Sequence, residues 1–212
     1  MTELWIVNNS ANKGGGIYFH PAGNYIPNIT NSSIIGNYAS DNGSAIFFND
    51  TDTNPQISGL TITNNSGSSI YIQNGSPSII QSNIAYNSMG AYNANNSNFI
   101  NAINNYWGNQ SGPYHPSQNS NGQGDSVNQW VSIDPWLTAP NTNAPPIPVQ
   151  NPAIAGQGND FINLIWDASL IGDLAGYKLY YNSNSSGFPY ENIIDVGIDT
   201  SYTCLLYTCP SP

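Results

Sequence analysis

The chain has 212 residues and a formal net charge of −10, and charged residues make up only 7% of it, against about a quarter in an average soluble protein. Lys13 and Lys178 are its only Lys or Arg residues, which excludes nucleic acid as a partner because phosphate neutralisation requires clustered basic side chains. Binding to an anionic membrane surface is disfavoured on the same ground. No apolar run approaches the roughly eighteen residues of a membrane span.

An isoleucine that leads into asparagine within two or three positions recurs through the first half of the chain. The separations are about 29, 27, 22 and 19 residues, a period that indicates a repeat architecture. The leading isoleucines are Ile6, Ile35, Ile62, Ile84 and Ile103.

Short apolar segments lie between these repeats and predict further strands. In residues 14–19, 43–48 and 68–72, small residues precede an alternating apolar triplet, and residues 56–60 and 78–80 each follow a proline. Three short strands in each repeat of about 20–30 residues, with no helical periodicity, predict a parallel β-solenoid.

An up-and-down barrel or a sandwich is the alternative. Either would place hairpin dipeptides between adjacent strands, and Asn42-Gly43 and Asn74-Gly75 fit that role. The unequal lengths of the repeats favour solenoid loops.

Like residues stack on like in such a solenoid, because successive parallel strands lie about 4.8 Å apart. We therefore predict an interior column of Ile35, Ile62 and Ile84. Asn37 and Asn64 are predicted to belong to a side-chain amide ladder at one corner.

Four motifs close the repeat region: NNYWG at 104–108, GPYHP at 112–116, GQGD at 122–125 and DPWL at 134–137. Together with the repeats, this series resembles the right-handed parallel β-helix proteins secreted by bacteria, and in particular the segment with which many of them end. The resemblance covers residues 1–138. It implies that Trp107, Trp130 and Trp136 cover the open end of the helix, since repeat folds need capped termini.

A proline-rich stretch, residues 139–149, is predicted to be an extended linker. The segment that follows, residues 150–203, contains INLIWD and LAGYKLYY, which resemble strands of a fibronectin type III domain. This implies an immunoglobulin-like β-sandwich with Trp166 as its core tryptophan. Because such a domain needs about 100 residues, we expect this one to be incomplete.

Neither end of the chain is expected to be an end of the natural protein. Residues 204–212 resemble translated adapter sequence and are expected to be a non-native tail. The chain opens on LWIV without a signal peptide, which indicates a fragment whose export signal lies upstream.

Pectate lyases and polygalacturonases share the fold that the resemblance implies, so catalysis has to be considered. The lyases use an arginine base, which this chain lacks, and hydrolysis needs paired carboxylates. The acids of the repeat region are scattered and are interpreted as turn and surface residues: Glu3, Asp41, Asp50, Asp52, Asp125 and Asp134. An enzyme is thus disfavoured, and the alternative is a fragment of a polysaccharide lyase or hydrolase whose catalytic repeats lie upstream.

Calcium is the one candidate cofactor. Asp50, Asp52 and Asn54 alternate as the oxygen ligands of a calcium loop do. Pro55 stands where such a loop has glycine, and the alternative is an Asp/Asn-rich turn.

Tyr18, Tyr71 and Tyr92 are predicted to form an outward aromatic row that binds carbohydrate by stacking. The alternative is a set of ordinary half-buried strand tyrosines. The sequence as a whole favours an all-β, non-catalytic, extracellular or cell-surface protein that binds polysaccharide or cell-surface glycans, with the fibronectin type III-like part as a spacer. A purely structural stalk is the third possibility.

Overall fold

The computed structural model describes residues 1–20, 27–49, 54–169, 174–182 and 190–205. Every regular element in these ranges is a β-strand, so the prediction of an all-β protein is confirmed. No helix able to cross a membrane occurs in the described part of the chain. Contacts divide the chain into two units, Met1–Ile147 and Pro148–Pro212.

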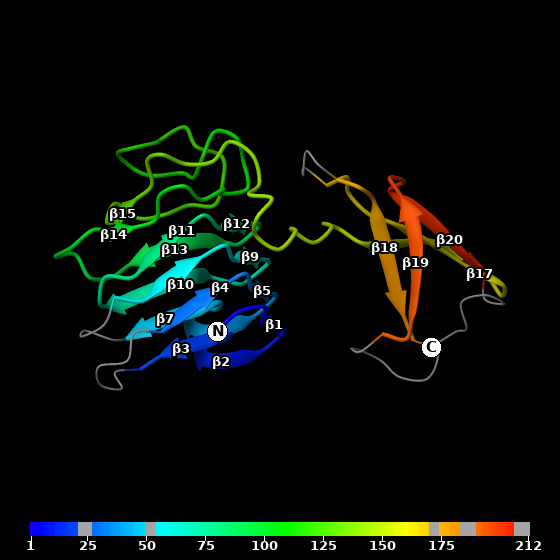
Figure 1. Cartoon of the computed structure of the whole chain (residues 1–212), viewed down its shortest axis with the longest axis horizontal. Coiled ribbons are helices and arrows are strands. Elements are labelled where there is room, and N and C mark those ends of the chain that lie inside the picture. The colour runs from blue at the N-terminus through cyan, green and yellow to red at the C-terminus, as the bar shows by residue number, and fades with distance from the viewer. Residues whose placement is uncertain (21–26, 50–53, 170–173, 183–189, 206–212) are drawn as a thin grey trace. The chain divides into compact units, whose positions relative to one another are not determined.

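Three parallel sheets and one additional strand pair build the first unit (Figure 1). Sheet 1 contains β4 (Asn28–Thr30), β8 (Gln56–Ser58), β11 (Ser78–Ile80), β14 (Ile100–Asn101) and β15 (Val131–Ser132). Sheet 2 contains β1 (Trp5–Val7), β5 (Ser33–Ile35), β9 (Thr61–Thr63) and β12 (Asn83–Ala85). Sheet 3 contains β3 (Ile17–Phe19), β7 (Ile46–Asn49), β10 (Ser68–Asn74) and β13 (Met89–Asn93), and the additional pair is β2 (Ser10–Lys13) with β6 (Tyr38–Asn42).

The chain visits sheets 1, 2 and 3 in turn, and each visit adds a strand beside the one from the preceding repeat. All of these pairings are parallel. Asn42-Gly43 and Asn74-Gly75 each separate two strands that are not paired with each other. The hairpin alternative is therefore wrong at both dipeptides, since a hairpin turn would join antiparallel neighbours.

An isoleucine column runs through sheet 2, displaced by one residue from part of the prediction. Ile6, Ile34, Ile62 and Ile84 are in register, and the last three are fully buried. Ile35 instead pairs with Val7 and Thr63. The prediction for Ile35 is wrong because two isoleucines are adjacent in β5, and strand residues alternate between faces.

The asparagine ladder is also displaced by one residue at one position. Asn64 is exposed and has a φ of 57°, and the amide in the ladder belongs to its buried neighbour Asn65. Asn8 and Gly36 adopt similar positive φ angles of 56° and 66°. Asparagine and glycine tolerate this left-handed conformation at a corner, which is why the pair Asn64-Asn65 was misassigned.

Backbone and side chain both take part in the ladder. The backbone N–H groups of Asn9, Asn37 and Asn65 donate to the Oδ1 atoms of Asn37, Asn65 and Asn87, each over 2.9 Å. The Nδ2 groups donate to the same Oδ1 atoms over 3.0–3.1 Å. Asn65 Nδ2 also donates to the carbonyls of Ile34 and Thr63, so its amide is fully used.

Part of the proline-rich segment packs on the outer face of sheet 2. The backbone N–H of Asn141 donates to Asn83 Oδ1 over 2.7 Å, and Asn83 Nδ2 donates to the Asn141 carbonyl over 3.1 Å. The Thr61 hydroxyl donates to the Pro145 carbonyl, and Ala144 is buried. This stretch therefore belongs to the first unit, and the boundary between the units falls at Ile147.

The second unit contains a three-stranded antiparallel sheet and a separate antiparallel pair. Trp166 packs edge-on against Tyr177, with ring centroids 5.5 Å apart. Cys204 and Leu205, the first residues of the expected tail, pair with Ile162 and Phe161. The strands are β16 (Ala153–Gln157), β17 (Phe161–Ile165), β20 (Ser201–Leu205), β18 (Tyr177–Tyr181) and β19 (Asn192–Gly197).

The adjacent pair Ile34 and Ile35 tests the corrected column. Ile34→Ala should lower the free energy of unfolding by about 2–5 kcal/mol because it opens a cavity in the core. Ile35→Ala should cost clearly less, because Ile35 is only partly buried. Urea denaturation followed by circular dichroism measures both, and equal losses would contradict the assignment.

Asn65 and Asn64 test the ladder in the same way. Asn65→Ala removes an amide that bonds two neighbouring repeats and should destabilise the protein by about 1–3 kcal/mol or more, since buried backbone groups lose their partners. Asn64→Gly keeps the left-handed corner and should change stability little. The midpoint of thermal unfolding distinguishes them, and a larger effect of Asn64→Gly would refute the ladder assignment.

Candidate functional site

Four aromatic rings stack in a row on sheet 3. Tyr18, Phe47, Tyr71 and Tyr92 occupy matching positions of β3, β7, β10 and β13. Successive ring centroids lie 5.1, 5.2 and 5.6 Å apart, with interplanar angles of 3°, 18° and 10°. We call these four residues the aromatic ladder.

The three tyrosines of the predicted row thus lie in one ladder, but the sequence prediction omitted Phe47. A signal for it was present, because Phe47 has the same place in GSAIFF as Tyr18 has in GGGIYF. Side-by-side alignment of the two segments identifies it.

Stacking changes what the row can offer to a ligand. Phe47 is fully buried, with Tyr18 on one face and Tyr71 on the other. Tyr18 and Tyr92, at the ends of the ladder, are 40% and 36% exposed. The inner ring faces are covered by neighbouring rings, so a ligand that stacks on the ladder can do so only at its ends.

Polar groups surround the edge of the ladder. Asn49 Nδ2 donates to the Tyr18 hydroxyl over 3.0 Å, and Asn74 Nδ2 donates to Asn49 Oδ1 over 3.2 Å. Lys13 Nζ lies 5.1 Å from the centroid of the Phe47 ring and 3.5 Å from an Asp41 carboxylate oxygen. The only lysine of the first unit is therefore already paired.

Burial raises the pKa of Tyr71, and the neighbouring Tyr92 and Asp41 raise it further. This phenol therefore stays protonated at neutral pH. The edge of the ladder can accordingly present neutral hydroxyl and amide groups to a ligand.

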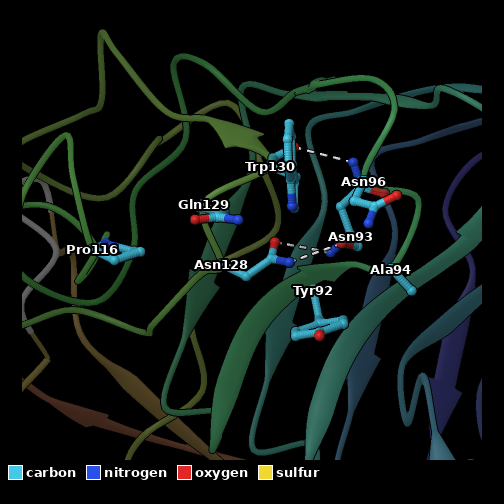
Figure 2. A pocket seen from close by; sticks show the side chains of 8 residues that line it. All are labelled: Tyr92, Asn93, Ala94, Asn96, Pro116, Asn128, Gln129 and Trp130. Carbon is cyan, nitrogen blue, oxygen red and sulfur yellow. Dashed lines mark hydrogen bonds between the residues drawn. The ribbon is translucent and has the colours of Figure 1, made fainter.

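A pocket of about 370 Å³ lies at the Tyr92 end of the ladder. Figure 2 shows Tyr92 on one side of it and Trp130 on the opposite side, with Asn128 between them. The complete lining is Tyr92, Asn93, Ala94, Asn96, Pro116, Asn128, Gln129 and Trp130. All of these side chains are uncharged, and amides predominate.

Asp125 ends the amide ladder. Its carboxylate accepts hydrogen bonds from the backbone N–H of Asn87 over 3.1 Å and from Asn87 Nδ2 over 2.7 Å. Burial raises the pKa of Asp125 to about 7, although the hydrogen bonds from Asn87 act in the opposite direction. Asp125 lies at a bend, as predicted, but it is only partly exposed, and its carboxylate continues the amide ladder.

His115 is fully buried in the GPYHP turn. Its Nδ1 accepts hydrogen bonds from the backbone N–H groups of Ser117 and Gln118 over 3.1 and 3.0 Å. Burial lowers its pKa. A neutral imidazole with the proton on Nε2 fits these bonds and holds the turn together.

Three of the four tryptophans with predicted structural roles, Trp107, Trp136 and Trp166, lie in different surroundings. Trp107 is fully buried in the core of the first unit, and a Cβ on Gly90 would approach its ring to 2.8 Å. Trp136 is partly buried and packs against the same core. Trp166 packs against Tyr177 in the second unit.

The predicted calcium ligands are only partly covered by the structure. Asp50 and Asp52 lie outside the described residues. Asn54 is exposed, and its carbonyl accepts a hydrogen bond from Gln56 Nε2. Within the described ranges, no three His, Cys, Asp or Glu side chains gather as a metal site would require.

Comparisons with known proteins found no match among family models, curated proteins or solved structures.

The raised pKa of Asp125 predicts a pH dependence of stability. An unfolded Asp titrates near about 3.9, so between about pH 4 and pH 7 the folded chain holds one proton more than the unfolded chain. This contribution to stability is present below about pH 4 and is lost as the pH rises through about 7. Asp125→Asn keeps a neutral side chain, so its stability relative to the native protein should increase over this range and level off above it.

Urea denaturation at several pH values checks this difference. Asp134→Asn, a change at an exposed carboxyl, is measured alongside as the control. A difference between Asp125→Asn and the native protein that is independent of pH would refute the assigned pKa.

Proposed function

We propose that residues 1–138 form a right-handed parallel β-helix and that the second unit is related to fibronectin type III domains. Three parallel sheets visited in turn, with in-register isoleucine and asparagine columns, support the first part. The right hand is the one that crossover connections between parallel strands adopt in almost all proteins. The pairing of β17 with β16 and β20, beside a separate β18–β19 pair, supports the second part.

We infer that the protein is a non-catalytic secreted or cell-surface protein that binds glycans through sheet 3. The aromatic ladder is the observation that carries this function. It combines exposed terminal rings with a neutral edge of tyrosine hydroxyls and asparagine amides. Sugars combine apolar C–H faces with many hydroxyl groups, and such a surface can satisfy both.

The composition of the chain supports an extracellular location. Solubility comes from Asn, Ser, Thr, Gln and Gly instead of from charge. Such a surface neither attracts nor strongly repels neutral polysaccharide.

Retention of the whole chain on a glycan array tests the function. Native protein should be retained on at least one neutral glycan and should release no reducing ends from it. Simultaneous replacement of Tyr18, Tyr71 and Tyr92 by Ala should weaken retention by about tenfold or more, because aromatic stacking is worth about 1–3 kcal/mol per contact.

Tyr38→Ala is the matched control, since Tyr38 is exposed and lies outside the ladder. Circular dichroism establishes that the variants are folded. Retention that survives the triple replacement, or turnover of the glycan, would overturn the proposal.

A further inference from the structure

The aromatic ladder ends at Tyr92 because the next position holds an asparagine. A parallel bridge joins Ala91 to Val127, so the parallel register places Asn128 beside Tyr92. A fifth ring would stand at this position if the column continued.

The Asn128 side chain turns to the backbone of the neighbouring strand. Asn128 Nδ2 donates to the Asn93 carbonyl over 2.8 Å, and the Asn93 N–H donates to Asn128 Oδ1 over 3.1 Å. These two bonds hold the amide in place (Figure 2). Asn128 and Tyr92 both line the pocket of about 370 Å³ at this end of the ladder.

Aromatic groups bound this pocket on two sides (Figure 2). One face of the Tyr92 ring is stacked on Tyr71. Tyr92 also lines the pocket. Trp130 contacts Phe99, with ring centroids 5.3 Å apart. The volume falls within the range of small-ligand pockets, about 300–1,000 Å³.

We propose that this pocket is a binding site for one neutral pyranose ring, which stacks on Tyr92 in the place of the missing fifth aromatic. The inference rests on the glycan-binding function proposed above and narrows it to one subsite and one class of sugar. The C–H face of a pyranose carries partial positive charge and is attracted to the negative face of an aromatic ring. The exposed side-chain amides of Asn96 and Gln129 supply donors and acceptors for its hydroxyls.

Charge excludes an acidic sugar from this pocket. None of the lining residues is charged, and Lys13 is paired with Asp41 beside Phe47. The chain as a whole carries a net charge of −10. A uronate would therefore meet no cation in the pocket and a repulsive field around it.

Titration of the whole chain with methyl glycosides, followed by tryptophan fluorescence and by saturation-transfer NMR, tests the site. Methyl glucoside, galactoside and mannoside are the neutral probes, methyl glucuronide is the acidic probe, and indole is the purely aromatic probe. At least one neutral glycoside should bind more tightly than the glucuronide and than indole.

Three substitutions locate the binding. Tyr92→Ala should weaken binding by about tenfold or more. Asn128→Tyr places a fifth ring in the gap and should abolish binding, and circular dichroism and thermal unfolding show whether this variant is folded. Tyr38→Ala changes an exposed tyrosine outside the ladder and should leave the affinity for the neutral glycoside unchanged.

The outcomes separate this inference from the general function. Loss of binding in Tyr92→Ala with unchanged binding in Tyr38→Ala supports the pocket. Glycoside binding that survives Tyr92→Ala, or that prefers the glucuronide or indole, overturns the pocket, while the array result decides the general glycan binding separately. Absence of binding to every neutral glycan overturns both.

Discussion

The amide ladder is the interaction on which the arrangement of the first unit depends. Parallel strands from successive repeats bring the same corner into contact again and again, and each corner leaves a backbone N–H without a strand partner. Asn37, Asn65 and Asn87 supply an acceptor for that N–H from the next repeat. Because buried donors are costly when unpaired, the ladder fixes the register in which one repeat lies upon another.

Asp125 takes the last position of this column with a carboxyl group in place of an amide. It can accept from Asn87 as an amide oxygen would, but its charged form is disfavoured by burial, and its pKa rises to about 7. The end of the ladder is thus a titratable group with a structural role. A perturbed carboxyl is often taken as a sign of catalysis, but burial at the end of the ladder accounts for the raised pKa of Asp125.

The register that stacks asparagines in one column stacks aromatic rings in another. In the middle of the aromatic ladder, neighbouring rings cover both faces of Phe47, so no face of that ring is open to a ligand. The ladder offers ring faces only at its two ends, and at the Tyr92 end the next position holds Asn128, whose amide bonds to the backbone of Asn93. Repetition therefore stabilises sheet 3, and the break in the repetition creates the pocket.

The repeats in sequence were sufficient to predict many of the strands of the first unit, the existence of isoleucine and asparagine columns, and the row of three tyrosines, but not the β2–β6 pair. The predicted columns are displaced by one residue at Ile35 and Asn64. Each lies beside an identical residue, so the sequence alone does not show which of the two side chains points inward until the corner geometry is known. Phe47 is missing from the predicted row because that row was defined by tyrosines. Trp130 was interpreted as a plug of the open end, and no local signal showed that it faces Tyr92 across a pocket.

Sequence alone determined that the chain is all-β, with apolar and amide residues repeating at a strand-like period, because local alternation and repeat length depend only on neighbouring residues. Tertiary structure decided which isoleucine and which asparagine enter each column, that Asp125 ends one of them, and that residues 141–145 pack on sheet 2. It also decided that Asn128 lies beside Tyr92. These features depend on contacts between residues more than twenty positions apart, and such contacts are set only when the repeats lie upon one another.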